Sequence, residues 1–326
     1  MSAMTRRFLF IAGALIALGI AAPAKAQGDY PNRTIRIVVG FAAGGGNDIF
    51  ARLVGAKLQE LIGQPVIIEN KPGAGVRLAN EYAANQPADG YTLLVAASGG
   101  MSIASAIYPK LSYHPTRSFV PLTMIANFPL ILAVPGNHPA KTVAELVAWM
   151  KANADKSNYA TSSPAFTIAT ELFKLKTGAP GQAIPYKSSG ESLVSVIGGQ
   201  TLLTIADGPP TVPLVKGGQV KALAVTGAVR SAELPDVPSM AEAGLPEVNT
   251  GLWSGVFVPA ATPVPIVKKL EETLRRAIAD PDVNARLKAM AVNPGGGSSD
   301  EFRAMIDADI KTTADVVKAA NLTFAE

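Results

Sequence analysis

The chain has 326 residues, of which 48% are hydrophobic and 17% are charged. This length exceeds the ~250–300 residues at which one hydrophobic core usually stops growing, so it predicts two lobes, and the composition excludes a largely disordered chain. The sequence contains no cysteine, which excludes a disulfide framework and a thiolate metal site.

The N-terminus has the pattern of an export signal. Arg6 and Arg7 precede an apolar run over residues 8–22, and Ala24-Lys25-Ala26 has the small-x-small form of a signal-peptidase site. The apolar run is shorter than the ~20 residues that a membrane-spanning helix needs. We therefore predict a signal peptide over residues 1–26, cleavage after Ala26 and a periplasmic protein, while the export route, Sec or twin-arginine, stays open.

The basic character of the chain comes mostly from this segment. Three of the 29 basic residues leave with the peptide, so 26 remain against 25 acidic residues. No later segment has a Lys/Arg stripe with interleaved aromatic residues, so nucleic acid is not a predicted partner.

The first strand–turn–helix pattern lies near the mature N-terminus. The β-branched run Ile35–Val39 predicts a strand, three glycines follow it, and the apolar spacing over Asn47–Ile62 predicts a helix that ends at Gly63. A helix start carries unpaired N–H groups and a partial positive charge, which suits an anion, although an ordinary strand–helix connection would look the same. We expect Asn47 or Asp48 to cap the helix. The candidate ligand contacts here are Ala43, Gly44, Gly45, Gly46, Asn47 and Asp48.

Short β-branched runs then alternate with helical runs, which is typical of parallel α/β sheets. Ser98-Gly99-Gly100 repeats the anion-friendly turn more weakly, and Ser98 joins the candidates. The predicted elements are a helix over 76–84 and strands over 66–69, 92–96, 119–125 and 130–134.

A second strand–turn–helix pattern follows in the other half of the chain. Thr142 begins a capping box for a helix to about residue 154. Tyr159–Thr161 predicts a strand that leads through a small polar turn into a helix reaching Lys176. Two such turns facing each other across a cleft could hold the two ends of a dianion. The candidate residues of this turn are Thr161, Ser162, Ser163, Phe166 and Thr167.

The rest of the chain predicts further elements and a return to the first lobe. Tyr186 precedes a helix to Ile197, and Asp207-Gly208-Pro209-Pro210 is expected to close a strand; Tyr186 and Asp207 complete the candidate set. Strands are predicted over 201–206, 221–225 and 253–258, and helices over 263–279 and 298–320. The first lobe is predicted over 27–127 and 250–326, and the second over 128–249.

Catalytic and metal-binding patterns are missing. His114 and His138 both stand beside proline, and the chain has no P-loop ending, no Gly-x-Ser-x-Gly elbow and no Gly-x-Gly-x-x-Gly spacing. Asp48, Glu69, Asp89 and Asp207 are more simply caps or turn residues than a catalytic carboxylate pair. We therefore predict no enzyme, no metal and no cofactor.

The sequence resembles one family, the periplasmic receptors of tripartite tricarboxylate transporters, or Bug proteins. The resemblance covers nearly the whole mature chain and rests on segments in a specific joint order. These are residues 41–48, 69–75, 88–94, 171–173, 185–187, 198–200, 221–226, 230–231, 234–238 and 242–246.

This resemblance implies a Venus-flytrap protein of two lobes, each a mostly parallel sheet flanked by helices. In such a protein main-chain N–H groups and ordered waters hold a carboxylate between the two turns, and membrane transporter subunits are the partners. We expect a monomer. A secreted α/β enzyme acting on anionic substrates and a ligand sensor for a signalling partner remain the alternatives.

The second turn departs from the family pattern. Family members usually carry Gly-x-Gly-Ser/Thr and a histidine there, whereas this chain has Pro164, Ala165 and Phe166. Phe166 either packs as core or faces the ligand. If it faces the ligand, it favours a carboxylate with an apolar or aromatic body over citrate.

Overall fold

The computed structural model describes residues 30–108 and 110–319. The predicted signal peptide lies outside these ranges. Within them, no helix has both the length and the apolar character needed to cross a membrane. All contacts reported below lie within the unit that begins at Arg33.

The first sheet has six strands in the order β11-β4-β10-β3-β1-β2. β1 pairs in parallel with β2 and β3, whereas β10 runs antiparallel to both β3 and β4. The apolar, β-branched residues of β1 and β3 are almost fully buried, as expected for central strands covered on both faces. The strands are β1 Ile35–Val39, β2 Val66–Asn70, β3 Thr92–Ala97, β4 Phe119–Pro129, β10 Gly251–Pro259 and β11 Asn293–Gly296.

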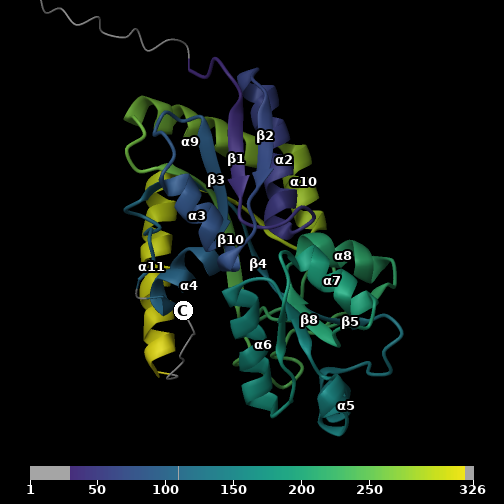
Figure 1. Ribbon diagram of the computed structural model, residues 1–326. Coiled ribbons are helices and arrows are strands. Elements are labelled where there is room, and N and C mark those ends of the chain that lie inside the picture. Colours follow the sequence, from purple (N-terminus) through teal and green to yellow (C-terminus); the bar gives the residue numbers. More distant parts are fainter. Residues whose placement is uncertain (1–29, 109, 320–326) are drawn as a thin grey trace, which may run out of the picture. The chain divides into compact units, whose positions relative to one another are not determined.

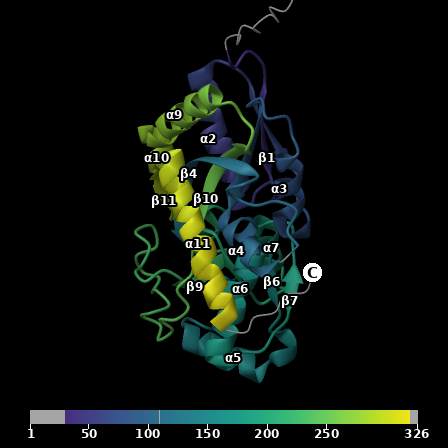
Figure 2. The ribbon, with the colours of Figure 1, turned by 90° about the vertical axis from the view of Figure 1, so that its left-hand side faces the viewer.

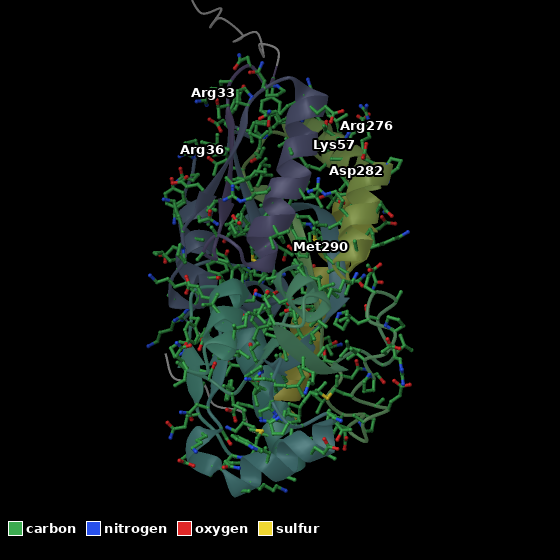
Figure 3. All side chains as sticks on the ribbon, turned by 90° about the vertical axis from the view of Figure 1, so that its right-hand side faces the viewer. Arg33, Arg36, Lys57, Arg276, Asp282 and Met290 are labelled. Carbon is green, nitrogen blue, oxygen red and sulfur yellow. The ribbon has the colours of Figure 1, made fainter. Side chains whose placement is uncertain are left out.

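Helices cover both faces of this sheet (Figure 1). α2, α9 and α10 pack together on one face. Lys57 of α2, labelled in Figure 3, pairs there with Asp280 at 2.9 Å. On the other face α11 packs along α4 and β4 (Figure 2), and Trp253 Nε1 donates to Asp309 of α11 at 2.9 Å. The helices are α2 Gly46–Ile62, α3 Arg77–Ala84, α4 Ser102–Ile107, α9 Val264–Ala279, α10 Pro281–Ala289 and α11 Ser299–Ala319. We call the sheet with these helices the first lobe.

The second sheet has five strands in the order β7-β6-β8-β5-β9. β6 pairs in parallel with β7 and β8, while β5 runs antiparallel to β8 and β9. The strands are β5 Ile131–Pro135, β6 Tyr159–Thr161, β7 Ala183–Pro185, β8 Leu203–Ala206 and β9 Val220–Val225. The helices are α5 Val143–Ala152, α6 Pro164–Thr177, α7 Ser189–Ile197 and α8 Gly208–Lys216. We call this part the second lobe.

The chain passes between the lobes twice. β4 stays in the first sheet to Pro129, past the predicted boundary at residue 127, and β5 begins the second sheet at Ile131. Buried Thr226 joins the two passages, because its hydroxyl accepts from Leu130 N–H at 2.8 Å and donates to Thr250 O at 2.7 Å. The predicted lobe boundaries themselves remain a prediction.

The predicted two-lobe α/β fold class is confirmed. The prediction that each sheet is mostly parallel is wrong, because three of the five strand pairings in the first sheet and two of the four in the second are antiparallel. The capping boxes at Thr142 and Ser298 form as expected; Ser298 Oγ accepts from Glu301 N–H at 3.2 Å, and Glu301 accepts from Ser298 N–H at 2.7 Å. Asp207 follows the last residue of β8, as predicted, but it also stands at the N-cap position of α8, a helix that the sequence analysis did not predict. Prolines fit the first turn of a helix, where no N–H partner is needed. The sequence reasoning also missed α10 and β11.

An aromatic cluster fills the core of the first lobe on the α11 side. Phe302 of α11 packs edge-on against Trp253 with ring centroids 5.2 Å apart, and Phe257 lies 5.4 Å from it. A Cβ on Gly255, which lies between them on β10, would overlap the Phe302 ring. The strand therefore needs glycine there so that α11 can pack closely.

Gly255→Ala should lower the free energy of unfolding by about 1–3 kcal/mol, because it overpacks this cluster. Gly251→Ala is the matched control, since a Cβ at this position on the same strand meets nothing within 4 Å. Urea unfolding should leave the control within about 0.5 kcal/mol of the wild type. Equal stability of the two variants would contradict the packing described here.

Candidate functional site

The cap of the helix that follows the first predicted turn differs from the prediction. α2 begins at Gly46, and Gly45 holds the N-cap position without a side-chain cap, so the prediction that Asn47 or Asp48 caps the helix is wrong. Asn47 Oδ1 accepts from Ser254 Oγ at 2.6 Å. Asp48 folds back to accept from Gly44 N–H at 3.0 Å and also pairs with Arg52. Asp48 thus stabilises the glycine turn instead of capping the helix.

The electrostatics of Asp48 fit this structural role. Burial acts to raise the pKa of its carboxyl, but hydrogen bonds from Arg52, Gly44 N–H and Asn70 outweigh burial and hold the pKa below its usual value. Asp48 therefore stays ionised and has its own partners within the first lobe.

Asp207 of the second lobe lies at the N-terminus of α2. Its side chain is 2% exposed, and a Cβ on Gly46 would overlap Asp207 Oδ2 and lie 2.7 Å from Asp207 Cγ. Among the described residues Asp207 Oδ1 has no hydrogen-bond partner. Burial raises the pKa of Asp207 to about 6, against the opposing hydrogen bonds from Ser189 and the Gly46 N–H. A carboxylate of the protein itself therefore occupies the expected anion position.

Other close contacts join the lobes around Asp207. Ala42 N–H donates to Lys187 O at 3.1 Å. A Cβ on Gly45 would lie 3.0 Å from Ser188 Cβ, and one on Gly190 would lie 2.7 Å from Gly44 O. The first turn is thus packed tightly against the start of α7.

A further glycine contact lies at the start of α8. A Cβ on Gly208 would overlap Met290 O at the end of α10 (Figure 3). Where the two lobes meet, glycines permit close backbone approaches that any side chain would block.

The second predicted turn lines a cavity of about 240 Å³ between the lobes. Thr161 Oγ1 and Thr167 Oγ1 lie 2.9 Å apart, and both bond to Ser163 O. Ser162 Oγ is buried and has no hydrogen-bond partner among the described residues. The cavity is lined by Gly75 and Tyr108 of the first lobe and by Thr161, Ser162, Ser163, Pro164, Thr167, Pro185 and Tyr186 of the second.

The N-terminus of α6 opens at this cavity. Ser163 is its N-cap residue but makes no side-chain cap bond, and Pro164 occupies the first turn. The helix therefore presents a partial positive charge beside the unpaired Ser162 hydroxyl. This combination can hold a carboxylate.

Tyr186 lines both this cavity and a second one of about 680 Å³. Its hydroxyl lies 2.6 Å from Ser195 Oγ, which in turn lies 2.9 Å from Thr201 Oγ1, so the ring is held in place. The second cavity is lined by Ala43 and Gly44 of the first lobe and by Tyr186, Gly190, Glu191, Val194, Ser195 and Gln200 of the second.

The structure divides the predicted site residues into two groups. Thr161, Ser162, Ser163, Thr167 and Tyr186 line the smaller cavity, and Ala43 and Gly44 line the second one. Neither cavity is lined by Gly45, Gly46, Asn47, Asp48, Ser98, Phe166 or Asp207.

Two of the predicted residues that line neither cavity, Phe166 and Ser98, face their own lobes. Phe166 is only 4% exposed on α6, and Ser98 Oγ accepts from Trp253 N–H at 3.4 Å. Sequence reasoning missed Tyr108, which no motif marks, and Gly75, whose glycine-rich turn was a usable signal.

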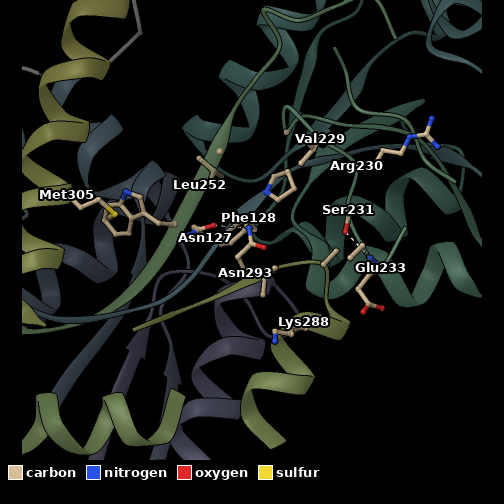
Figure 4. Close-up of a pocket in the computed structure, with 17 residues that line it drawn as sticks. Asn127, Phe128, Val229, Arg230, Ser231, Glu233, Leu252, Lys288, Asn293 and Met305 are labelled. Atoms are coloured by element: carbon tan, nitrogen blue, oxygen red, sulfur yellow. Dashed lines mark hydrogen bonds between the residues drawn. The ribbon is translucent and has the colours of Figure 1, made fainter. Parts of the chain in front are cut away.

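A third cavity of about 710 Å³, larger than these two, lies elsewhere, beside the passages between the lobes (Figure 4). Its charged lining residues are Arg230, Glu233 and Lys288. Arg230 pairs with Glu242 at 2.9 Å, and Glu233 pairs with Lys216 at 3.0 Å. Within the described ranges no unpartnered buried side-chain atom lines it. We therefore place the candidate site at the smaller cavity.

Comparison with known proteins gives a consistent result. A sequence model described as "Tripartite tricarboxylate transporter family receptor" matches residues 50–322. The curated protein BugT of Bordetella pertussis is 33% identical over 316 residues, which cover 96% of this chain and 97% of that protein. This chain belongs to that receptor family. The resemblance inferred from the sequence motifs is thereby confirmed.

Solved structures agree with this assignment. The periplasmic binding protein BugD matches this receptor with a TM-score of 0.86 and 30% identity, over 90% of this chain and 99% of BugD. A structure described as R. palustris Rpa4515 with adipate matches with a TM-score of 0.85 and 34% identity, over 90% and 99% of the two chains.

The buried Asp207 predicts a pH dependence of the receptor's stability. Because its folded pKa is about 6, above the ordinary value of 3.8, the native state binds more protons than the unfolded state between these values. The stability contribution of Asp207 is therefore present at low pH and is lost as pH rises through about 6. Asp207→Asn should remove this dependence, so the melting temperature of the wild type should rise relative to the variant from pH 7.5 to pH 4.5. A difference that does not vary with pH would contradict this assignment.

Proposed function

We propose that this chain is a periplasmic receptor that captures a small organic carboxylate between its lobes and delivers it to the membrane subunits of a tripartite tricarboxylate-type transporter. The observation that carries the proposal is the unpartnered Ser162 hydroxyl at the N-terminus of α6. A buried hydroxyl without a partner is costly, and a bound carboxylate would satisfy it.

The chemistry of the cavity favours a carboxylate. The α6 N-terminus supplies unpaired N–H groups and a partial positive charge, and Ser162 supplies a hydroxyl donor. Tyr186 and the Thr161–Thr167 pair form the polar wall around this point. The volume of about 240 Å³ is below the ~300–1,000 Å³ typical of drug-sized ligands, so the ligand is a small acid.

The first turn plays a different part in this proposal. Asp207 already occupies the N-terminus of α2, so the ligand's carboxylate binds at α6. Gly45 and Gly46 then act in joining the lobes, and Ala43 and Gly44 border the adjoining cavity.

The position of Ser162 also favours a receptor over a secreted enzyme. A nucleophilic serine needs a neighbouring base, and the described residues provide no hydrogen-bond partner for this hydroxyl. His114 and His138 do not line the cavity; their ring Nδ1 atoms accept from Thr116 N–H and Ala140 N–H, both at 3.2 Å. The adipate named with the R. palustris relative and the periplasmic BugD support the same proposal.

A thermal-shift screen tests this function. Small mono- and dicarboxylates should raise the melting temperature and nucleotides should not, because binding at ~100 times the dissociation constant adds about 2.7 kcal/mol to the free energy of unfolding. Stabilisation by a nucleotide with no response to any acid would refute the proposal.

Ser162→Ala tests the site more sharply. It should weaken binding of the best acid by roughly 10- to 100-fold, because a hydrogen bond to a charged group is worth about 1.5–3 kcal/mol. It should not lower the melting temperature of the ligand-free protein, because the lost hydroxyl has no partner in the structure.

The control is Ser157→Ala, which removes a hydroxyl that donates to Asn153 O at 2.7 Å after α5. This variant should lose stability and keep its affinity. If Ser162→Ala retained wild-type affinity in isothermal titration, Ser162 would not belong to the site.

A further inference from the structure

The turn before α3 has a strained backbone. Ala74, Gly75 and Val76 have φ angles of 47°, 59° and 72°, which all lie in the left-handed region. This region is unfavourable for a β-branched residue such as Val76. Strain of this kind persists only where the surroundings hold it, and it clusters at functional sites.

Close packing holds this turn in place. Val76 is 5% exposed, and a Cβ on Gly40 would lie 2.8 Å from Val76 Cβ, while one on Gly100 would overlap Val76 Cγ2. A Cβ on Gly75 would lie 3.2 Å from Pro164 Cδ at the start of α6. The strained turn is therefore fixed at the border of the candidate cavity.

Arg77 follows this turn and begins α3. Its Nε donates to Ala74 O at 3.0 Å, and its guanidinium lies over the ring of Tyr108, 4.0 Å from the ring centroid. Tyr108 and Gly75 both line the cavity. Two contacts thus fix the guanidinium beside the first-lobe wall of the cavity.

The two Nη atoms of Arg77 are available as hydrogen-bond donors. Among the described residues no hydrogen bond or ion pair engages its two Nη atoms. Neighbouring cations on the first lobe differ, because each has a carboxylate partner within 4 Å. These are Arg36 with Glu69, Arg52 with Asp48 and Lys71 with Glu69.

We infer that Arg77 is a specificity-determining residue that binds the second carboxylate of a dicarboxylic ligand whose first carboxylate lies at the α6 N-terminus. This inference rests on the proposed function. A planar guanidinium with free Nη donors matches a carboxylate in a bidentate arrangement. Arg77 itself does not line the cavity, but its guanidinium stacks on Tyr108, which does, so the ligand would meet one positive group from each lobe.

The test compares dicarboxylates with monocarboxylates of equal length. The probes are succinate, glutarate and adipate against butyrate, pentanoate and hexanoate, measured by isothermal titration. The wild type should prefer the dicarboxylates. Arg77→Gln should weaken their binding by roughly 10- to 100-fold and should change monocarboxylate binding by less than about threefold. Arg77→Lys keeps the charge but loses the fork, so its loss should be intermediate.

Arg33→Gln is the matched control. The Arg33 guanidinium also lies 4.0 Å from a tyrosine centroid, that of Tyr91, but Tyr91 lines neither cavity between the lobes, whereas Tyr108 lines the smaller one. Arg33→Gln should leave the affinities for dicarboxylates and for monocarboxylates unchanged. Equal weakening of both acid classes by Arg77→Gln, or no weakening of either, would overturn the role of Arg77 while leaving the receptor function standing. A wild type that binds none of the probes would overturn the proposed function and this inference with it.

Discussion

The contact between the Asp207 carboxylate and the N-terminus of α2 is the constraint on which the arrangement of the lobes depends. It buries an acidic group of the second lobe against Gly46 of the first. Any residue larger than glycine at position 46 would overlap the Asp207 carboxylate. Burial disfavours the charged carboxylate, while the Gly46 N–H and Ser189 favour it, and the balance raises its pKa to about 6. The contact between the lobes therefore combines close glycine packing with the ionisable Asp207, whose pKa is about 6.

Because Asp207 lies at the N-terminus of α2, the N-termini of α2 and α6 have different roles. α2 and α6 both begin after a strand and a short turn, so both can stabilise an anion. The protein's own carboxylate fills the first, and the second opens into a cavity whose walls come from both lobes. Because Gly75 and Tyr108 line that cavity from the first lobe, the proposed ligand binding would be coupled to the contact between the lobes. A ligand that bridges the two walls would favour the arrangement in which both walls line the cavity.

Much of this architecture could be predicted from the sequence. The alternation of β-branched and amphipathic runs gave β1, α2, β6 and α6 to within a residue or two, because local patterning decides such elements. The role of the first turn could not be predicted, since the group that fills it, Asp207, follows a distant strand. α8 was missed because prolines that usually break structure occupy its first turn. Tyr108 and Arg77 owe their positions to tertiary packing around a strained turn, which leaves no periodic signal.

A crystal structure of the receptor with a bound acid, such as adipate, tests the proposed site most directly. We expect a ligand carboxylate within hydrogen-bond distance of Ser162 Oγ at the start of α6, with Asp207 still against Gly46. A ligand carboxylate bound at Gly44–Gly46, with Asp207 displaced from the N-terminus of α2, would contradict it.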